Sequence, residues 1–71
     1  MGKIIGNNNS IPSRLLRLKD AARYLSLSPW KLRQLIYSGV IPFVQPEPGS
    51  PYLLDLRDLD HYVETNKHAI L

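Results

Sequence analysis

The chain has 71 residues, with nine Lys and Arg side chains against six Asp and Glu side chains, and it contains no cysteine. Its length indicates one domain with a small core, and the absence of cysteine excludes a disulfide framework and a thiolate metal site. The sequence has no apolar run as long as a signal peptide or a membrane span, so we expect a cytoplasmic protein with no membrane contact.

Charge is distributed unevenly along the chain. Residues 1–45 contain seven Lys and Arg side chains against Asp20 alone, whereas residues 46–71 contain two against five acidic side chains. A basic end is typical of nucleic-acid-binding domains, although a run of charge by itself is more often only a solvated face.

Three regions follow from composition. Residues 1–13 (MGKIIGNNNSIPS) are rich in Gly, Asn and Ser without periodicity, which predicts a flexible N-terminal tail. Residues 14–66 are expected to form the domain, and residues 67–71 a short C-terminal tail. The domain begins with a short extended lead-in over residues 14–17, whose leucines are expected to cover the core while its arginines face outward.

The first helix is predicted after this lead-in. Apolar residues recur there at i, i+3, i+4 and i+7, which places them on one stripe of a helix. Arg17 and Leu18 occupy the positions where a capping side chain is expected, and Asp20 compensates in part through the helix dipole. The stripe consists of Leu18, Ala21, Ala22 and Leu25.

A second helix is predicted from Pro29 to Ser38. The Ser28 hydroxyl can accept a hydrogen bond from the free amides of a new first turn, where Pro29 has no amide to lose. Gly39 suits the left-handed residue that ends a helix, and Pro42 prevents continuation.

The two faces of this second helix differ in chemistry. Its inward stripe comprises Pro29, Leu32, Leu35 and Ile36, and its outward stripe comprises Trp30, Arg33, Gln34 and Tyr37. Arginine can bond guanine edges, glutamine can bond adenine edges, and aromatic rings can touch thymine methyls or the backbone. The outward stripe therefore predicts a helix that lies in a DNA major groove. An alternative for Trp30 is that it folds back over the next segment as the rim of the core.

Beyond Gly39 the sequence predicts two short strands and a third helix. Residues 40–45 (VIPFVQ) and 52–54 (YLL) are expected to pair around the turn-forming residues 46–51 (PEPGSP). Prolines within this stretch cannot donate to a ladder, so it should be a small edge hairpin. Asp55 is expected to cap the third helix, with Asp58 in its first turn and its end near Asn66. The buried face of that helix would consist of Leu56, Leu59, Tyr62 and Val63.

Four segments in this order resemble a known family. They are residues 19–22 (KDAA), 24–28 (YLSLS), 35–42 (LIYSGVIP) and 58–62 (DLDHY). Together they resemble the excisionase-type small helix-turn-helix family, which is related to the DNA-binding domain of MerR-type regulators found in phages and mobile elements. The resemblance covers roughly residues 15–64.

The resemblance implies a mainly α fold with a small β-hairpin, a winged helix-turn-helix in the order helix, turn, helix, two-stranded wing, helix. It implies sequence-specific binding of double-stranded DNA, with the second helix in the major groove and the hairpin as a wing over the backbone or minor groove. Members act as excisionases beside an integrase or as small transcriptional regulators, and further copies can line up on repeated sites. The expected DNA-binding residues are Arg17, Lys19, Arg23, Ser28, Trp30, Lys31, Arg33, Gln34 and Tyr37, and Arg14 is also expected to meet phosphate.

Two features depart from the family pattern. The wing tip, residues 45–50, contains Glu47 where the family usually carries arginines, so the wing is either held away from the backbone or reaches a protein partner. Pro29 and Trp30 replace residues that are more often polar or basic.

A protein-interaction module with the same fold, and a DNA-binding domain like that of phage terminase small subunits, remain as alternatives. No nucleophile with a base and no phosphate-binding glycine loop is evident, so neither an enzyme nor a cofactor is expected. His61, Glu64 and His68 share one helix spacing, but exposed polar positions explain them better than a metal site. Tyr24 is expected in the core.

Overall fold

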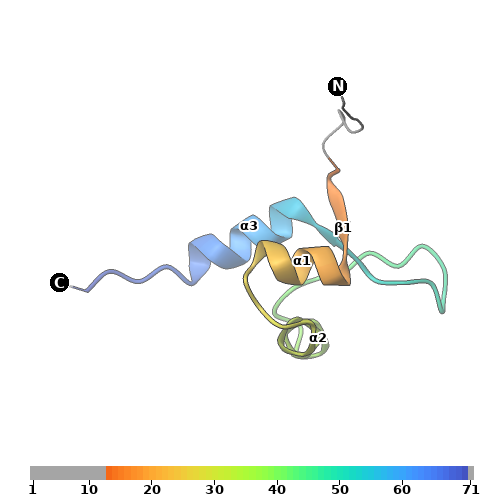
Figure 1. Cartoon of the computed structure of the whole chain (residues 1–71), viewed down its shortest axis with the longest axis horizontal. Coiled ribbons are helices and arrows are strands. Elements are labelled where there is room, and N and C mark those ends of the chain that lie inside the picture. Colours follow the sequence, from red (N-terminus) through yellow and green to blue (C-terminus); the bar gives the residue numbers. More distant parts are fainter. Residues whose placement is uncertain (1–12, 71) are drawn as a thin grey trace, which may run out of the picture.

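Residues 13–70 are described by the computed structural model, in which three helices pack together beside a short two-stranded sheet (Figure 1). In chain order the elements are β1 (Leu15–Arg17), α1 (Leu18–Tyr24), α2 (Pro29–Tyr37), β2 (Leu53–Asp55) and α3 (Leu56–Thr65). The predicted winged helix-turn-helix fold is confirmed. Of the tail predicted over residues 1–13, all but Ser13 lies outside the described residues, and residues 67–70 form neither helix nor strand.

The turn between α1 and α2 is closed by backbone hydrogen bonds that satisfy the end of α1. The Leu27 amide donates to the Ala22 carbonyl at 2.8 Å, and the Ser26 amide donates to the Arg23 carbonyl at 3.1 Å. This pair of bonds defines a Schellman motif, whose left-handed residue is usually glycine. Ser26 takes that position here with φ 58°. As the sequence predicts, the α1 N-cap Arg17 makes no side-chain capping bond.

Helix α2 begins and ends as its sequence predicts. The Ser28 hydroxyl accepts a 3.1 Å hydrogen bond from the Lys31 amide, and Pro29 is the first helical residue. At the other end Gly39 has φ 80°, and the Val40 amide donates to the Leu35 carbonyl at 2.9 Å, which completes a second Schellman motif. Figure 1 shows α2 nearly end-on, so that it crosses the direction of α1.

The strand pairing differs from the hairpin that the sequence predicts. Strand β2 pairs antiparallel with the lead-in strand β1, with Leu15 opposite Asp55, Leu16 opposite Leu54 and Arg17 opposite Leu53. Of the strand predicted over residues 40–45, only Val44 pairs, through an isolated bridge to Leu53 with N–H···O distances of 2.7 and 2.9 Å. Pro42 and Pro46 lack the amides that a longer ladder would need.

We call residues 40–54 the wing. In Figure 1 the wing projects from the end of the domain opposite the C-terminal end of α3. Its base is fixed in the core by Ile41 and Leu54, which are almost completely buried. Among residues 13–70, seven side chains are buried in the core, namely Ala21, Ala22, Leu32, Ile36, Ile41, Leu54 and Leu59.

Several side chains expected in the core lie at its margin or outside it. Pro29 and Leu15 are exposed. Val63 is 38% exposed, because it follows Leu59, the last buried residue of α3. Tyr24 is 51% exposed, because its hydroxyl donates a 2.5 Å hydrogen bond outward to Asp60 Oδ1, linking the end of α1 to α3. This hydrogen bond raises the pKa of Tyr24.

The start of α3 is held by Asp55 and Arg14. Asp55 Oδ1 accepts a 2.9 Å hydrogen bond from the Arg57 amide, as predicted for its capping role. Asp55 Oδ2 accepts from Arg14 Nε at 3.1 Å and from Nη2 at 2.8 Å, while the Arg14 carbonyl accepts from the Leu56 amide at 2.9 Å. The Arg14 hydrogen bonds, followed by that of the Arg57 amide, lower the pKa of Asp55.

This lowered pKa predicts a defined pH dependence of stability. A carboxylate whose pKa is lower in the folded state stabilises the fold above its unfolded pKa of about 3.9, and this contribution is lost as the pH falls through the folded pKa. Asp55→Asn should therefore melt below the parent at neutral pH, and the two melting temperatures should converge as Asp55 of the parent becomes protonated. Circular dichroism melts across the acid range measure this.

Glu64→Gln is the matched control, because it removes a carboxylate whose ion pair with Lys67 lies on the open surface of α3. Exposed pairs of this kind contribute little, so its melting temperature should follow the parent at every pH. Equal effects of the two substitutions would show that the Asp55 contacts carry no special stability.

Candidate functional site

The outward stripe of α2 is not buried by any other part of residues 13–70. All four of its side chains are exposed, with Trp30 at 67% and Tyr37 at 65%. The alternative that Trp30 folds back as the rim of the core is therefore wrong, whereas the predicted outward orientation of the stripe is confirmed. Two large aromatic residues beside an arginine and a glutamine form a surface suited to a partner.

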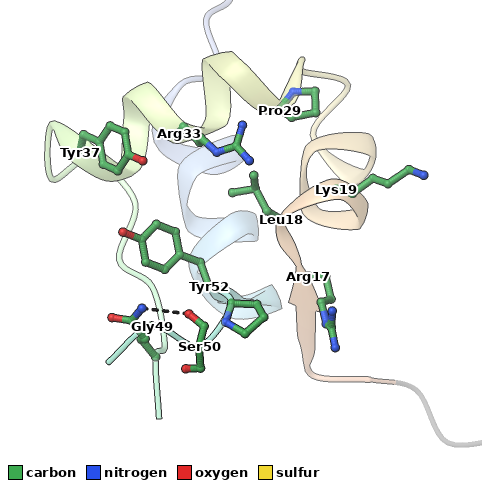
Figure 2. A pocket seen from close by; sticks show the side chains of 11 residues that line it. Arg17, Leu18, Lys19, Pro29, Arg33, Tyr37, Gly49, Ser50 and Tyr52 are labelled. Atoms are coloured by element: carbon green, nitrogen blue, oxygen red, sulfur yellow. Dashed lines mark hydrogen bonds between the residues drawn. The ribbon is translucent and has the colours of Figure 1, made fainter. Parts of the chain in front are cut away.

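A groove of about 750 Å³ separates α2 from the wing (Figure 2). Helix α2 contributes Pro29, Arg33 and Tyr37, which recur at every fourth position and so lie along one edge of the helix. The opposite edge is formed by Arg17 and Lys19 at the β1–α1 junction. The wing contributes Gln45, Tyr52 and the turn residues Gly49, Ser50 and Pro51.

The side chains of this groove supply hydrogen-bond donors and positive charge. Figure 2 shows the Arg33 guanidinium extending over Leu18 towards the middle of the groove, with Tyr37 and Tyr52 on one flank. Arg17 and Lys19 are exposed along the opposite edge. No Asp or Glu lines the groove, and none of the ion pairs found among residues 13–70 involves Arg17, Lys19 or Arg33. The groove is therefore an electropositive channel.

The wing tip is a pre-formed turn. The Ser50 amide donates to the Glu47 carbonyl at 3.0 Å, the Ser50 hydroxyl donates to the same oxygen at 2.7 Å, and Gly49 has φ 87°. Proline followed by glycine at the two central positions is typical of a type II turn. Gln45 Nε2 also donates to the Ser50 carbonyl at 2.9 Å (Figure 2).

The base of the wing is stiffened by an aromatic contact. The Phe43 and Tyr52 rings pack with their centroids 4.5 Å apart and their planes at 45°. Such offset pairs are favourable beyond the area that they bury. The wing therefore holds Tyr52 in a fixed position beside α2, a placement for which the sequence carries no local signal.

The predicted DNA-binding residues fall into separate locations. Arg17, Lys19, Arg33 and Tyr37 line the groove, whereas Arg23, Lys31, Trp30 and Gln34 are exposed outside it. The Ser28 hydroxyl is engaged in capping α2. Arg14, also expected to meet phosphate, forms an ion pair with Asp55 at 2.8 Å.

Among residues 13–70, no three His, Cys, Asp or Glu side chains come together as a metal site. None of the helices in this range has the length and apolar composition needed to cross a bilayer.

The comparison with protein families gives a match over most of the chain. The model of a helix-turn-helix domain matches residues 15–67, which is most of the chain and includes every helix and both strands. Comparison with curated proteins and with solved structures gave no significant match. The extent of the family match, together with the exposed α2 and the electropositive groove beside it, shows that the chain belongs to the small, excisionase-like helix-turn-helix family of DNA-binding domains.

Proposed function

We propose that this protein binds duplex DNA sequence-specifically, as an excisionase or a small transcriptional regulator, with α2 in the major groove and the wing beside the backbone. The proposed contact residues are those expected from the sequence, except that Ser28 acts through its cap and Arg14 is excluded. An integrase, or further copies of the chain on repeated sites, would be the protein partners.

One observation carries this proposal. The outward stripe of α2 is exposed along its whole length and borders a groove lined with cations and without carboxylates. Arg33 and Gln34 have the donors that base edges and phosphates accept, and α2 is the right shape for a major groove. The fully buried core of a protein–protein interface is, by contrast, more apolar and is depleted of charged residues such as lysine.

A salt titration tests the proposal. Each cation that meets a phosphate should contribute about −0.9 to the slope of log affinity against log salt concentration. Five cations of the proposed contact surface lie outside the ion pairs found among residues 13–70, namely Arg17, Lys19, Arg23, Lys31 and Arg33. Binding to a duplex obtained by selection from a random pool should therefore weaken steeply with salt. An affinity that scarcely responds to salt would exclude duplex binding of this kind.

A second candidate function is supported by the wing. Residues 40–54 contain no Lys or Arg, and Glu47 is exposed at the tip. A carboxylate at that position would be repelled by phosphate, so the tip is better suited to a basic surface of a protein partner, such as an integrase bound on the same DNA.

Glu47→Lys distinguishes the two roles of the wing. The turn depends on the backbone of Glu47 and on Ser50, so the substitution should leave the fold intact. If the tip approaches phosphate, the new cation should tighten binding to every duplex by a similar factor without sharpening sequence preference. Electrophoretic mobility shifts on selected and scrambled duplexes measure this, with Glu64→Lys on α3 as the charge-matched control. Weaker binding to all duplexes would show that the tip has another task.

A further inference from the structure

We infer, on the basis of the DNA-binding function proposed above, that the groove between α2 and the wing holds one sugar-phosphate strand of the duplex. Arg33 and Tyr37 then contact the backbone, and the base edges are read by Trp30 and Gln34. Of the two contacts open to Arg33, a guanine edge or a phosphate, this assigns the phosphate.

Helix geometry separates the two sets of side chains. Arg33 and Tyr37 are four positions apart, and with Pro29 they form the groove edge of α2. Trp30 and Gln34 are also four positions apart, but each follows a groove residue and is therefore rotated from it by about 100° around the helix axis. Neither lines the groove, and both are exposed. The outward stripe thus has two edges.

The chemistry of the groove fits a phosphodiester better than a base edge. The groove offers charged donors from Arg17, Lys19 and Arg33, and the hydroxyls of Tyr37 and Tyr52. Base edges present both donors and acceptors, whereas phosphate oxygens only accept. Leu18, Pro29 and Pro51 complete the lining, and no carboxylate is among its side chains. The polar side chains of the groove therefore match an anionic, acceptor-only ligand.

The arrangement of α2 and the wing also favours a sugar-phosphate strand of DNA in the groove between them. A helix inserted into the major groove has a sugar-phosphate strand along each side, and the wing lies beyond the groove edge of α2 (Figure 2). A sugar-phosphate strand of DNA that lies beside the groove edge of α2 passes between Arg33 on α2 and Tyr52 on the wing. Because Tyr52 is packed on Phe43, its ring is fixed before DNA arrives.

Duplexes with single neutral linkages test the inference. A selected duplex is prepared in versions in which one phosphodiester at a time is replaced by methylphosphonate, and affinities are measured for the parent, Arg33→Ala and Lys31→Ala. Arg33→Ala should weaken binding to all duplex sequences by a similar factor and reduce the salt slope by about 0.9. At one or two linkages the neutral replacement should weaken the parent but have no further effect on Arg33→Ala.

Lys31→Ala is the matched control, because it removes a cation from the same helix outside the groove. At the linkages where methylphosphonate weakens the parent but not Arg33→Ala, methylphosphonate should weaken Lys31→Ala as much as it weakens the parent. Tyr52→Phe, which keeps the packing on Phe43, should weaken binding without changing sequence preference. If Arg33→Ala instead relaxes preference at one base pair and keeps every methylphosphonate effect, the inference is overturned while the DNA-binding function stands. If the parent binds no duplex from the pool, the proposed function falls as well.

Discussion

Leu32→Ala is expected to unfold much of the protein at ambient temperature and to abolish binding to every DNA sequence together. Leu32 has no exposed surface and lies between α2 and the rest of the core. Replacing a buried leucine by alanine costs about 2–5 kcal/mol. Small domains have total stabilities of about 0.05–0.15 kcal/mol per residue, so a loss of this size removes most of the available stability. A thermal melt followed by circular dichroism measures the effect.

Leu35→Ala is the matched control on the same helix. Leu35 is only half-buried at the core margin, so its truncation leaves a smaller cavity and should lower the melting temperature less. A Leu32→Ala variant that melts like the parent would contradict the assignment of α2 to the centre of the core.

Gln34→Ala is expected to leave the melt unchanged and to alter DNA reading alone. Gln34 is exposed in the middle of α2, where alanine favours the helix. Losing a bidentate contact to a base should cost about 1–3 kcal/mol and relax the preference at one base pair, most directly an A·T pair. Because glutamine is neutral, the salt slope should stay the same. Affinities for a panel of single-base variants of a selected duplex measure both.

The control for this prediction is Gln45→Ala, which changes the same side-chain type on the wing. Gln45 bonds the Ser50 carbonyl, so its loss should affect the wing turn and not the preference at one base pair. If Gln34→Ala binds every single-base variant as the parent does, α2 does not read bases through this side chain. That result would favour the alternative that the protein is a protein-interaction module with the same fold.

The helix-turn-helix could be predicted because its signals are local. Ser28 next to Pro29 begins α2, and Gly39 ends it, through hydrogen bonds between residues only three to five positions apart. The start of α3 is also set locally, by the hydrogen bond from the Arg57 amide to Asp55 two positions earlier. Tyr24 was misplaced because spacing alone does not show that Asp60 on α3 offers its hydroxyl a partner outside the core.

The sheet and the groove depend on contacts between distant parts of the chain, which carry no local signal. Strand β1 has three residues, too few for alternation to be recognised, and its partner β2 lies far along the sequence. Tyr52 reads as an ordinary strand residue, and only the return of the wing towards α2 places it opposite Arg33. The exposed stripe on α2 was therefore predictable from the sequence. Which of its side chains line the groove and which lie outside it was not.

The tie between Arg14 and Asp55 also has a consequence for the order of folding. These residues are 41 positions apart, so joining them closes a loop that contains α1, α2 and the wing. Closing such a loop is entropically unfavourable until the elements inside it have formed, whereas α1 and α2 are connected by a short turn. We expect the helical pair to assemble early and the two ends of the domain to join late, so that substitutions at Arg14 mainly accelerate unfolding and leave the folding rate nearly unchanged.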